Sequence, residues 1–209
     1  QVGFDYSADI LEKIGVTTVE RQNPQVNDLN PAALGLGGMT NGISPLEMVG
    51  GYGTIANSGK YIEPVCYTKI ENKRGEVILT KIPKTNQVLN EGVAYVMSDI
   101  LRSVVTNGLG SPASLPNQPV CGKTGTTTDN YDAWFVGYTP KYAASLWIGN
   151  DSSIELSQGS TAASRLWNKI MRQCLANTPR QEFGPAPDNV VYATVDAYSG
   201  GLPDGGPTK

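Results

Sequence analysis

Residues 120–127 have the sequence VCGKTGTT, and two further apolar runs follow at 133–138 and 142–149. All three runs are short and contain β-branched or aromatic residues, which is typical of strands. The second and third runs are separated only by Thr139-Pro140-Lys141. Strands joined by so short a connection pair antiparallel, because a parallel crossover needs a dozen residues or more. The sequence therefore predicts an antiparallel sheet built from these strands.

Four helices are predicted around this sheet from apolar residues that repeat at the helical period. They cover residues 5–14, a segment from Ser44 to Gly59, a segment from Asn90 to Gly108, and residues 161–176. Helices beside an antiparallel sheet indicate the α+β type of α/β protein.

The second helix has a complete start signal. Ser44 is the predicted N-cap, Pro45 suits the first helical position, and Glu47 completes a capping box. Gly50, Gly51 and Gly53 weaken this helix, so we expect them to permit close packing against a neighbouring element.

A second strand pair and a tail complete the expected organisation. Residues 65–71 and 76–81 are predicted to form a hairpin across Asn72-Lys73-Arg74-Gly75. From residue 177 onward the chain is polar and rich in proline and glycine, with one strand-like segment at 190–195. We therefore expect residues 1–176 to form one unit and residues 177–209 an extension outside its core.

Composition excludes several classes of function. The 209 residues are 39% apolar and 17% charged, which is normal for a globular protein. A net charge of −3 provides no basic surface for nucleic acid. No apolar run approaches the length that a membrane span needs. The chain has no initiator methionine or signal peptide, so Gln1 is not expected to be its natural start.

Residue types restrict the chemistry further. The chain contains no histidine, so it cannot by itself supply a Ser-His-Asp or Cys-His catalytic arrangement. Cys66, Cys121 and Cys174 are too far apart for a zinc site, and we expect each to be a small buried apolar side chain. Their number allows one disulfide at most. No metal or organic cofactor is indicated.

The 120–127 strand is the candidate functional site. Side chains alternate along a strand, so Thr124 and Thr126 share a face, with the charge of Lys123 beside them. Gly125 lets a ligand approach the backbone closely. Such a strip suits a carboxylate and a carbonyl, and its edge can align an extended peptide. A plain polar edge strand remains the alternative.

A phosphate-binding loop is excluded, because the glycine that such a loop requires is replaced by Asn117.

Several segments resemble the penicillin-binding serine transferases, which share Ser-x-x-Lys, Ser-x-Asn and Lys-Thr-Gly motifs. The closer resemblance is to the C-terminal portion of the transpeptidase domain of class A (bifunctional) high-molecular-mass penicillin-binding proteins. It covers nearly the whole chain, through these segments: LGG (36–38), GISPLEM (42–48), YGTIANSG (52–59), GKTGTT (122–127), DAWFVGYTP (132–140) and VDAYSGGLP (195–203).

The resemblance implies an incomplete penicillin-binding fold. Neither Ser-x-x-Lys nor Ser-x-Asn occurs in the sequence, so the nucleophilic serine is expected before Gln1. The family then implies a D,D-transpeptidase that cross-links peptidoglycan stem peptides through an acyl-serine and is acylated by β-lactams. This fragment alone is expected to be inactive. Its partner would be the upstream half of the same domain.

By similarity, the implied catalytic residues are Lys123, which holds charge and supports proton transfer, and Thr126, whose backbone N–H forms half of an oxyanion hole. Thr124 and Thr126 would bind the substrate carboxylate through their hydroxyls, and Gly125 and Thr127 would contact substrate. Trp134 and Phe135 are predicted to pack in the core. Two roles stay open for Asp132: capping the turn between the strands, or steering an incoming amine.

The family also implies an extracytoplasmic location, with membrane contact only through an absent N-terminal anchor, and no nucleic-acid partner. Two other functions stay open. A serine β-lactamase shares the Lys-Thr-Gly strand but would hydrolyse penicillin with turnover. A non-catalytic peptidoglycan-binding or sensor module would bind D-Ala-D-Ala tightly without turnover.

Overall fold

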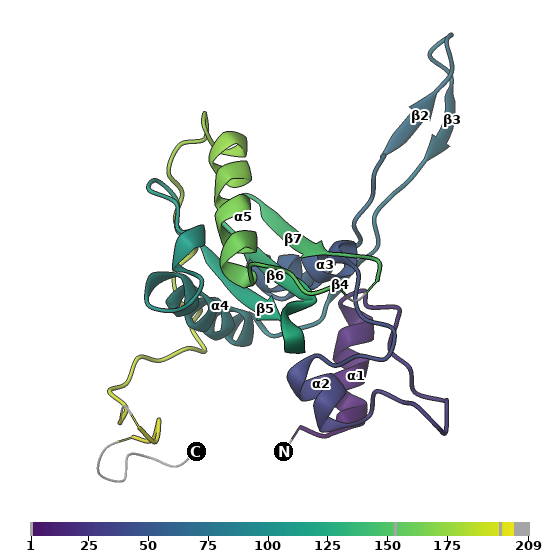
Figure 1. Ribbon diagram of the computed structural model, residues 1–209. Helices are drawn as coiled ribbons and strands as arrows, with labels where there is room; N and C mark the ends of the chain where they lie inside the picture. Colours follow the sequence, from purple (N-terminus) through teal and green to yellow (C-terminus); the bar gives the residue numbers. More distant parts are fainter. Residues whose placement is uncertain (1, 153, 197, 203–209) are drawn as a thin grey trace.

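The computed structural model describes residues 2–152, 154–196 and 198–202. Its centre is an antiparallel sheet in the order β5-β6-β7, formed by Cys121–Thr126, Asp132–Tyr138 and Ala143–Gly149. Figure 1 shows α5 (Ser160–Cys174) on one side of this sheet and α3 (Pro45–Ala56) on the other. The predicted α+β class, an antiparallel sheet flanked by helices, is confirmed.

The main apolar core lies between the sheet and α5. Phe135 of β6 is fully buried and meets Trp167 of α5 edge to face, with ring centroids 5.2 Å apart. The indole Nε1 of Trp167 also donates to the backbone oxygen of Ala144 at 3.0 Å. This core contains Val105, Ala113, Val120, Ala133, Phe135, Ala163, Trp167, Met171 and Leu175. The prediction that Phe135 packs in the core is confirmed.

A smaller core cluster lies on the α3 side of the sheet, around Leu101, Cys121 and Tyr138. Leu101 belongs to α4 (Glu91–Thr106), which packs along β5. The N-cap of α4 is Asn90, whose Oδ1 accepts from the N–H of Gly92 at 2.8 Å. Both faces of β5 are therefore supported by helices.

The start of α3 has the predicted capping box. The Ser44 hydroxyl accepts from the N–H of Glu47, and the Glu47 carboxylate accepts from the N–H of Ser44 at 2.9 Å. The Glu47 carboxylate also accepts hydrogen bonds from the N–H and the hydroxyl of Thr17, at 2.8 and 2.7 Å. Burial disfavours the charged form, but these hydrogen bonds outweigh it and lower the pKa of Glu47 to about 2.

We expect Glu47→Gln to lower the free energy of unfolding at pH 7 by about 1 kcal/mol, the usual loss for a helix cap. Because the folded pKa lies below the usual 4.5, the wild-type carboxylate stabilises the fold above that value. This contribution is lost as the pH falls from 4.5 toward 2, so the difference between the proteins should shrink there. Urea unfolding at several pH values measures it. The exposed Glu155→Gln is the control, and equal losses in both variants would contradict the prediction.

Two of the three α3 glycines make the close contacts predicted for them. A Cβ atom on Gly51 would lie 3.1 Å from Ile14 Cδ1, and one on Gly50 would lie 3.4 Å from Tyr61 and from Pro64. A Cβ atom on Gly53 would meet nothing within 4 Å, so the packing explanation is wrong for that residue.

The predicted hairpin is present but shorter. Strand β2 (Lys69–Glu71) pairs with β3 (Val77–Thr80), and Figure 1 shows both projecting from the body. Nearer the body, β1 (Lys60–Ile62) pairs with β4 (Thr85–Gln87).

Three short helical segments were missed by the sequence analysis. They are α2 (Pro31–Leu36) and the 3-10 turns η1 (Ser111–Ala113) and η2 (Thr128–Asn130).

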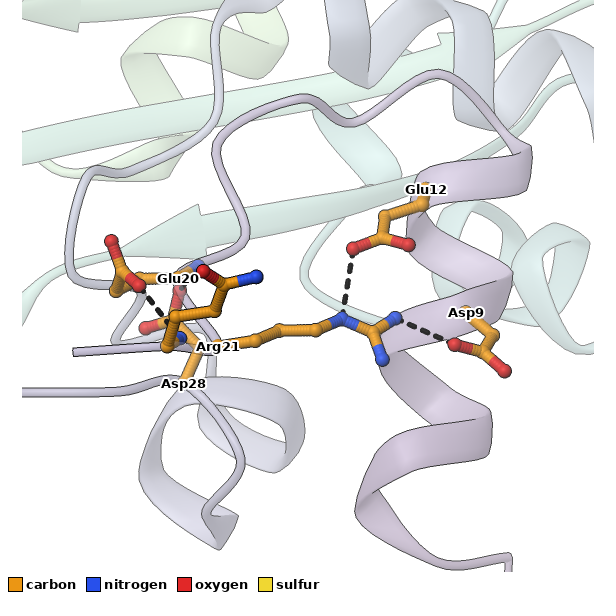
Figure 2. A network of polar contacts seen from close by, with 6 residues as sticks. Asp9, Glu12, Glu20, Arg21 and Asp28 are labelled. Atoms are coloured by element: carbon orange, nitrogen blue, oxygen red, sulfur yellow. Dashed lines mark hydrogen bonds and ion pairs between the residues drawn. The ribbon is translucent and has the colours of Figure 1, made fainter. Parts of the chain in front are cut away.

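Near the N-terminus, a polar network joins α1 (Phe4–Lys13) to the loop that follows it (Figure 2). Arg21 donates to Asp9 at 2.7 Å and to Glu12 at 2.8 Å. The fully buried Asp28 accepts from the N–H of Glu20 and from Thr40. These hydrogen bonds outweigh burial and lower the pKa of Asp28. The network fixes a loop that has little apolar core of its own.

The prediction of a strand at residues 190–195 is wrong, because these residues do not form one. Side-chain contacts attach the tail to the body instead. Phe183 meets Tyr138 edge to face with centroids 5.8 Å apart, and the Tyr192 and Tyr95 hydroxyls are 2.6 Å apart. The division at residue 176 stays a prediction.

The cysteines correct another expectation. All three thiols are free, and only Cys121 is buried, whereas Cys66 and Cys174 are exposed. Cys66 lies at the base of the projecting hairpin and Cys174 is the last residue of α5. Both side chains are exposed and do not pack in the apolar core.

Candidate active site

The candidate strip is the outer edge of the central sheet. Strand β5 pairs with β6 on one side, and no strand of the described residues pairs with its other side. Lys123 and Thr126 are exposed along it. The Lys123 ammonium donates to the carbonyl oxygen of Thr124 at 2.9 Å. The strand thus offers a cation and free backbone groups at one open edge.

The direction of those backbone groups follows from the hydrogen bonds at the end of β5. The N–H of Thr127 donates to the Asp132 oxygen at 3.2 Å, and therefore points toward the β6 side. Backbone groups of successive strand residues alternate in direction, so those of Lys123 and Gly125 also point toward β6. The N–H and C=O groups of Thr124 and Thr126 then point outward. The Lys123 contact with the Thr124 carbonyl agrees with this direction.

The side chains of the strip do not all meet on one face. Thr124 is 8% exposed and pairs with Phe135, which places it on the α5 side of the sheet. Lys123 pairs with Val136 and lies on the opposite face, with Cys121. The structure therefore separates the Thr124 hydroxyl from the Lys123 ammonium, which the sequence analysis had placed side by side.

Thr126 lies at the end of β5, beside the start of α5. A Cβ atom on Gly159, the residue before α5, would lie 3.7 Å from both Thr126 Oγ1 and Asn130 Oδ1. The glycine leaves the Thr126 hydroxyl accessible, and Thr126 and Thr127 are both exposed. Lys123, Thr126 and Thr127 are thus all exposed along this edge, although Thr126 shares the α5-side face with Thr124 and Lys123 lies on the opposite face.

Gly125 has a neighbour that the sequence analysis missed. A Cβ atom there would lie 3.2 Å from Trp134 Cβ on the adjacent strand. The glycine therefore makes room for Trp134 in addition to any ligand. Trp134 is only half-buried and tilts against Trp147, with centroids 6.3 Å apart.

The loop after β5 is held by backbone and side-chain bonds. The Thr127 hydroxyl accepts from the N–H of Asp132 at 2.8 Å, and the Asn130 oxygen accepts from Leu156 at 2.9 Å. Asp129 and Asn130 both have positive φ, which aspartate and asparagine tolerate better than most residues. The Asp132 carboxylate accepts from Trp147 Nε1 at 2.7 Å, so it anchors a neighbouring strand and does not cap the turn.

Comparison with known proteins identifies the family. Residues 2–172 match the family described as penicillin binding protein transpeptidase domain. The chain belongs to this family.

Relatives of this penicillin-binding protein chain extend the match over nearly its full length. It is 37% identical over 205 residues to penicillin-binding protein 1A of Clostridium botulinum, covering 97% of this chain and 24% of the relative. The crystal structure of penicillin-binding protein 1A from Haemophilus influenzae has the same fold, with a TM-score of 0.78 at 22% identity; the match covers 98% of this chain and 36% of that one.

A second structural neighbour is penicillin-binding protein PonA1 of Mycobacterium tuberculosis in complex with penicillin V, with a TM-score of 0.70 at 22% identity. The match covers 90% of this chain and 54% of PonA1. The resemblance to penicillin-binding proteins is therefore confirmed, as is the fold. The chain spans about a quarter of the length of the curated relatives it matches.

The buried thiol of Cys121, in the same strand as Lys123, is not suited to act as a nucleophile. Burial raises the pKa of Cys121 to about 12, so the thiol stays protonated at neutral pH. Tyr138 lies against it, its hydroxyl 2.8 Å from that of Ser98, and burial raises the Tyr138 pKa too. Cys121 thus supports β5 by packing.

Two of the hollows on the described surface are not lined by Lys123 or Thr126. The larger, about 530 Å³, lies between α4 and the tail and reaches Cys121. Strand β5 itself has no strand partner on its outer side within the described residues. In the described residues, no helix is long and apolar enough to cross a membrane, and no cluster of acidic or cysteine side chains is suited to hold a metal ion.

Proposed function

We propose that this chain forms the Lys-Thr-Gly wall of a D,D-transpeptidase whose nucleophilic serine lies in polypeptide before Gln1. The observation that carries the proposal is the open edge of β5, where Lys123 is exposed and the N–H of Thr126 points outward. An edge of this kind can align an extended peptide by backbone hydrogen bonds. Family membership supports the assignment.

The proposed reaction uses this edge in two steps. The serine oxygen attacks the carbonyl carbon of the penultimate D-Ala, and the terminal D-Ala leaves with a proton on its amine. An amine from a neighbouring stem peptide then attacks the acyl-serine, forms the cross-link and returns the serine hydroxyl. A β-lactam would stop the cycle at the acyl-serine.

Each residue of the edge has a role in this proposal. The Thr126 N–H donates to the oxygen that becomes negative during attack. The Thr126 hydroxyl, with Thr127, binds the terminal carboxylate, and Gly125 keeps the backbone within reach. Lys123 holds the positive charge that favours the anionic substrate and supports proton transfer. Because the Thr124 side chain is buried, we assign the contribution of Thr124 to its outward backbone N–H and C=O groups and not to its hydroxyl.

The upstream half of the domain is the proposed partner, and two surfaces of this chain support it. The outer edge of β7 is seven residues long, has no lysine or proline, and has no strand partner in the described residues. Such an edge normally needs a cover. Helix α4 also exposes Val93, Val96, Met97 and Ile100. We place the assembled domain at the extracytoplasmic face of the membrane, attached by an anchor before Gln1.

Labelling with fluorescent penicillin tests the proposal. We expect the full-length protein to become labelled and this chain alone to remain unlabelled, because the acylated serine is elsewhere. If the full-length protein is cut once before Gln1 and kept in its native state, the label should migrate with the upstream piece. Heat-denatured protein is the control.

Covalent label on this chain would contradict the proposal. Sustained hydrolysis of penicillin by the full-length protein would indicate a β-lactamase. Tight D-Ala-D-Ala binding by this chain, without turnover in the full-length protein, would indicate a sensor module.

A further inference from the structure

The projecting hairpin is the part of this fold that the proposed reaction does not use. We call residues 60–87, from β1 to β4, the arm (Figure 1). From Cys66 to Thr80, every residue except Asn72 is exposed. A two-stranded hairpin is at best marginally stable in water, so a long exposed one needs a surface to lie on.

Charge is distributed unevenly between the arm and the rest of the chain. The arm contains six lysine and arginine residues and three glutamates, a net charge of +3, whereas the whole chain has −3. Two of the glutamates are paired inside the arm, Glu71 with Lys69 and Glu63 with Lys81. The basic excess therefore faces outward on an otherwise acidic protein. Such a basic surface is suited to bind an anionic partner.

The tip presents two of these cations on a fixed turn. Asn72 Oδ1 accepts from the N–H groups of Arg74 and Glu76, at 2.8 and 3.1 Å. Gly75 has a φ of 80°, a left-handed conformation that favours glycine. Lys73 and Arg74 are exposed at the turn, and neither forms an ion pair within the described residues.

Aliphatic side chains lie on both faces of the ribbon behind this tip. Ile70 pairs with Leu79, and both are exposed on one face. Ile78, 66% exposed, points to the other face, since successive strand residues alternate. A groove on a partner protein covers one face of a ribbon. A lipid headgroup layer surrounds both faces.

Strand addition by another protein is disfavoured as well. The pairing register shifts between Ile70 and Glu71, and such bulges twist an edge away from further pairing. Lysines along the arm oppose edge pairing in the same way.

We propose that the arm binds an anionic lipid surface, with Lys73 and Arg74 among the headgroups and Ile70, Ile78 and Leu79 at the boundary with the acyl chains. This contact is separate from any N-terminal anchor. Amphipathic segments bind such surfaces through apolar burial together with attraction of basic residues to anionic lipid. In an anchored protein, the arm sets the orientation of the domain relative to the membrane.

Vesicle cosedimentation tests the proposal. The chain should sediment with vesicles of equal parts phosphatidylcholine and phosphatidylglycerol and remain in solution with phosphatidylcholine alone. Exchanging both tip cations, Lys73→Gln with Arg74→Gln, should weaken binding roughly thirtyfold. Ile78→Asn should weaken it through the apolar contribution. The matched control is Arg165→Gln with Lys169→Gln, which removes the same charge from the exposed face of α5.

Three results would overturn the proposal: no binding to anionic vesicles, equal weakening by the α5 control, or arm variants that dissociate a dimer in lipid-free sedimentation. The last result would assign the arm to a second copy of the protein. Circular dichroism checks the fold of each variant. If the chain does not fold alone, hydrogen exchange on the full-length protein in nanodiscs tests whether the arm contacts the lipid. Residues 69–81 should then be protected only with anionic lipid, and equal exchange in both lipids would reject the contact.

Discussion

Lys123→Ala in the full-length protein is expected to lower the rate constant of acylation by penicillin by about a hundredfold to ten-thousandfold, the range for loss of a group that assists proton transfer. Lys123 is exposed at the open edge of β5 and, among the described residues, bonds only to a carbonyl of its own strand, so its removal leaves the sheet intact. Time courses of fluorescent penicillin labelling measure the rate constant, and thermal unfolding checks the fold.

Two further variants make the result specific. Lys123→Arg keeps the charge but replaces a compact ammonium by a planar guanidinium, so it should recover only part of the rate. Lys141→Ala removes an exposed cation that lies 5.2 Å from the Tyr142 ring centroid, in the turn between β6 and β7, and should leave the rate unchanged. An unchanged rate in Lys123→Ala would remove Lys123 from the proposed mechanism.

Local signals made much of the fold predictable. The α3 start was predicted at the residue where it occurs, because Ser44 and Glu47 satisfy each other's N–H groups within one turn. The antiparallel pairing of β6 with β7 followed from a three-residue connection, which is too short for a parallel crossover. The candidate site was proposed from equally local information, since Lys123, Gly125 and Thr126 lie within four residues of one strand.

Features that depend on distant contacts were not predictable. The tail segment 190–195 has strand-like residues, yet it lies beside helix α4, and β-propensity is decided by such neighbours. The burial of Thr124 against the α5 core was also missed: alternation already separates Thr124 from Lys123, but only the tertiary packing decides which face of β5 the helix covers. The contact of Arg21 with two α1 carboxylates required the fold of the connecting loop, for which the sequence has no periodic signal.

The second large effect concerns the core behind the site. Trp167→Ala is expected to lower the free energy of unfolding by about 3–5 kcal/mol, the usual cost of deleting a buried tryptophan. Trp167 is 1% exposed, packs edge to face on Phe135, and donates to the Ala144 oxygen. The substitution therefore leaves a cavity and an unpaired carbonyl under the sheet. This loss is a large fraction of the stability of an ordinary domain.

Trp147→Ala separates the burial effect from loss of an indole. Trp147 is 38% exposed and also donates one hydrogen bond, to Asp132, so it matches Trp167 in residue type but not in burial. Urea unfolding of the full-length protein should show a clearly smaller loss for this variant. Because α5 packs against both β6 and β5, loosening the Trp167 contact should also displace the Lys-Thr-Gly strand and slow penicillin acylation before global unfolding. Equal stability losses in the two variants would mean that the α5 core does not hold the sheet in place.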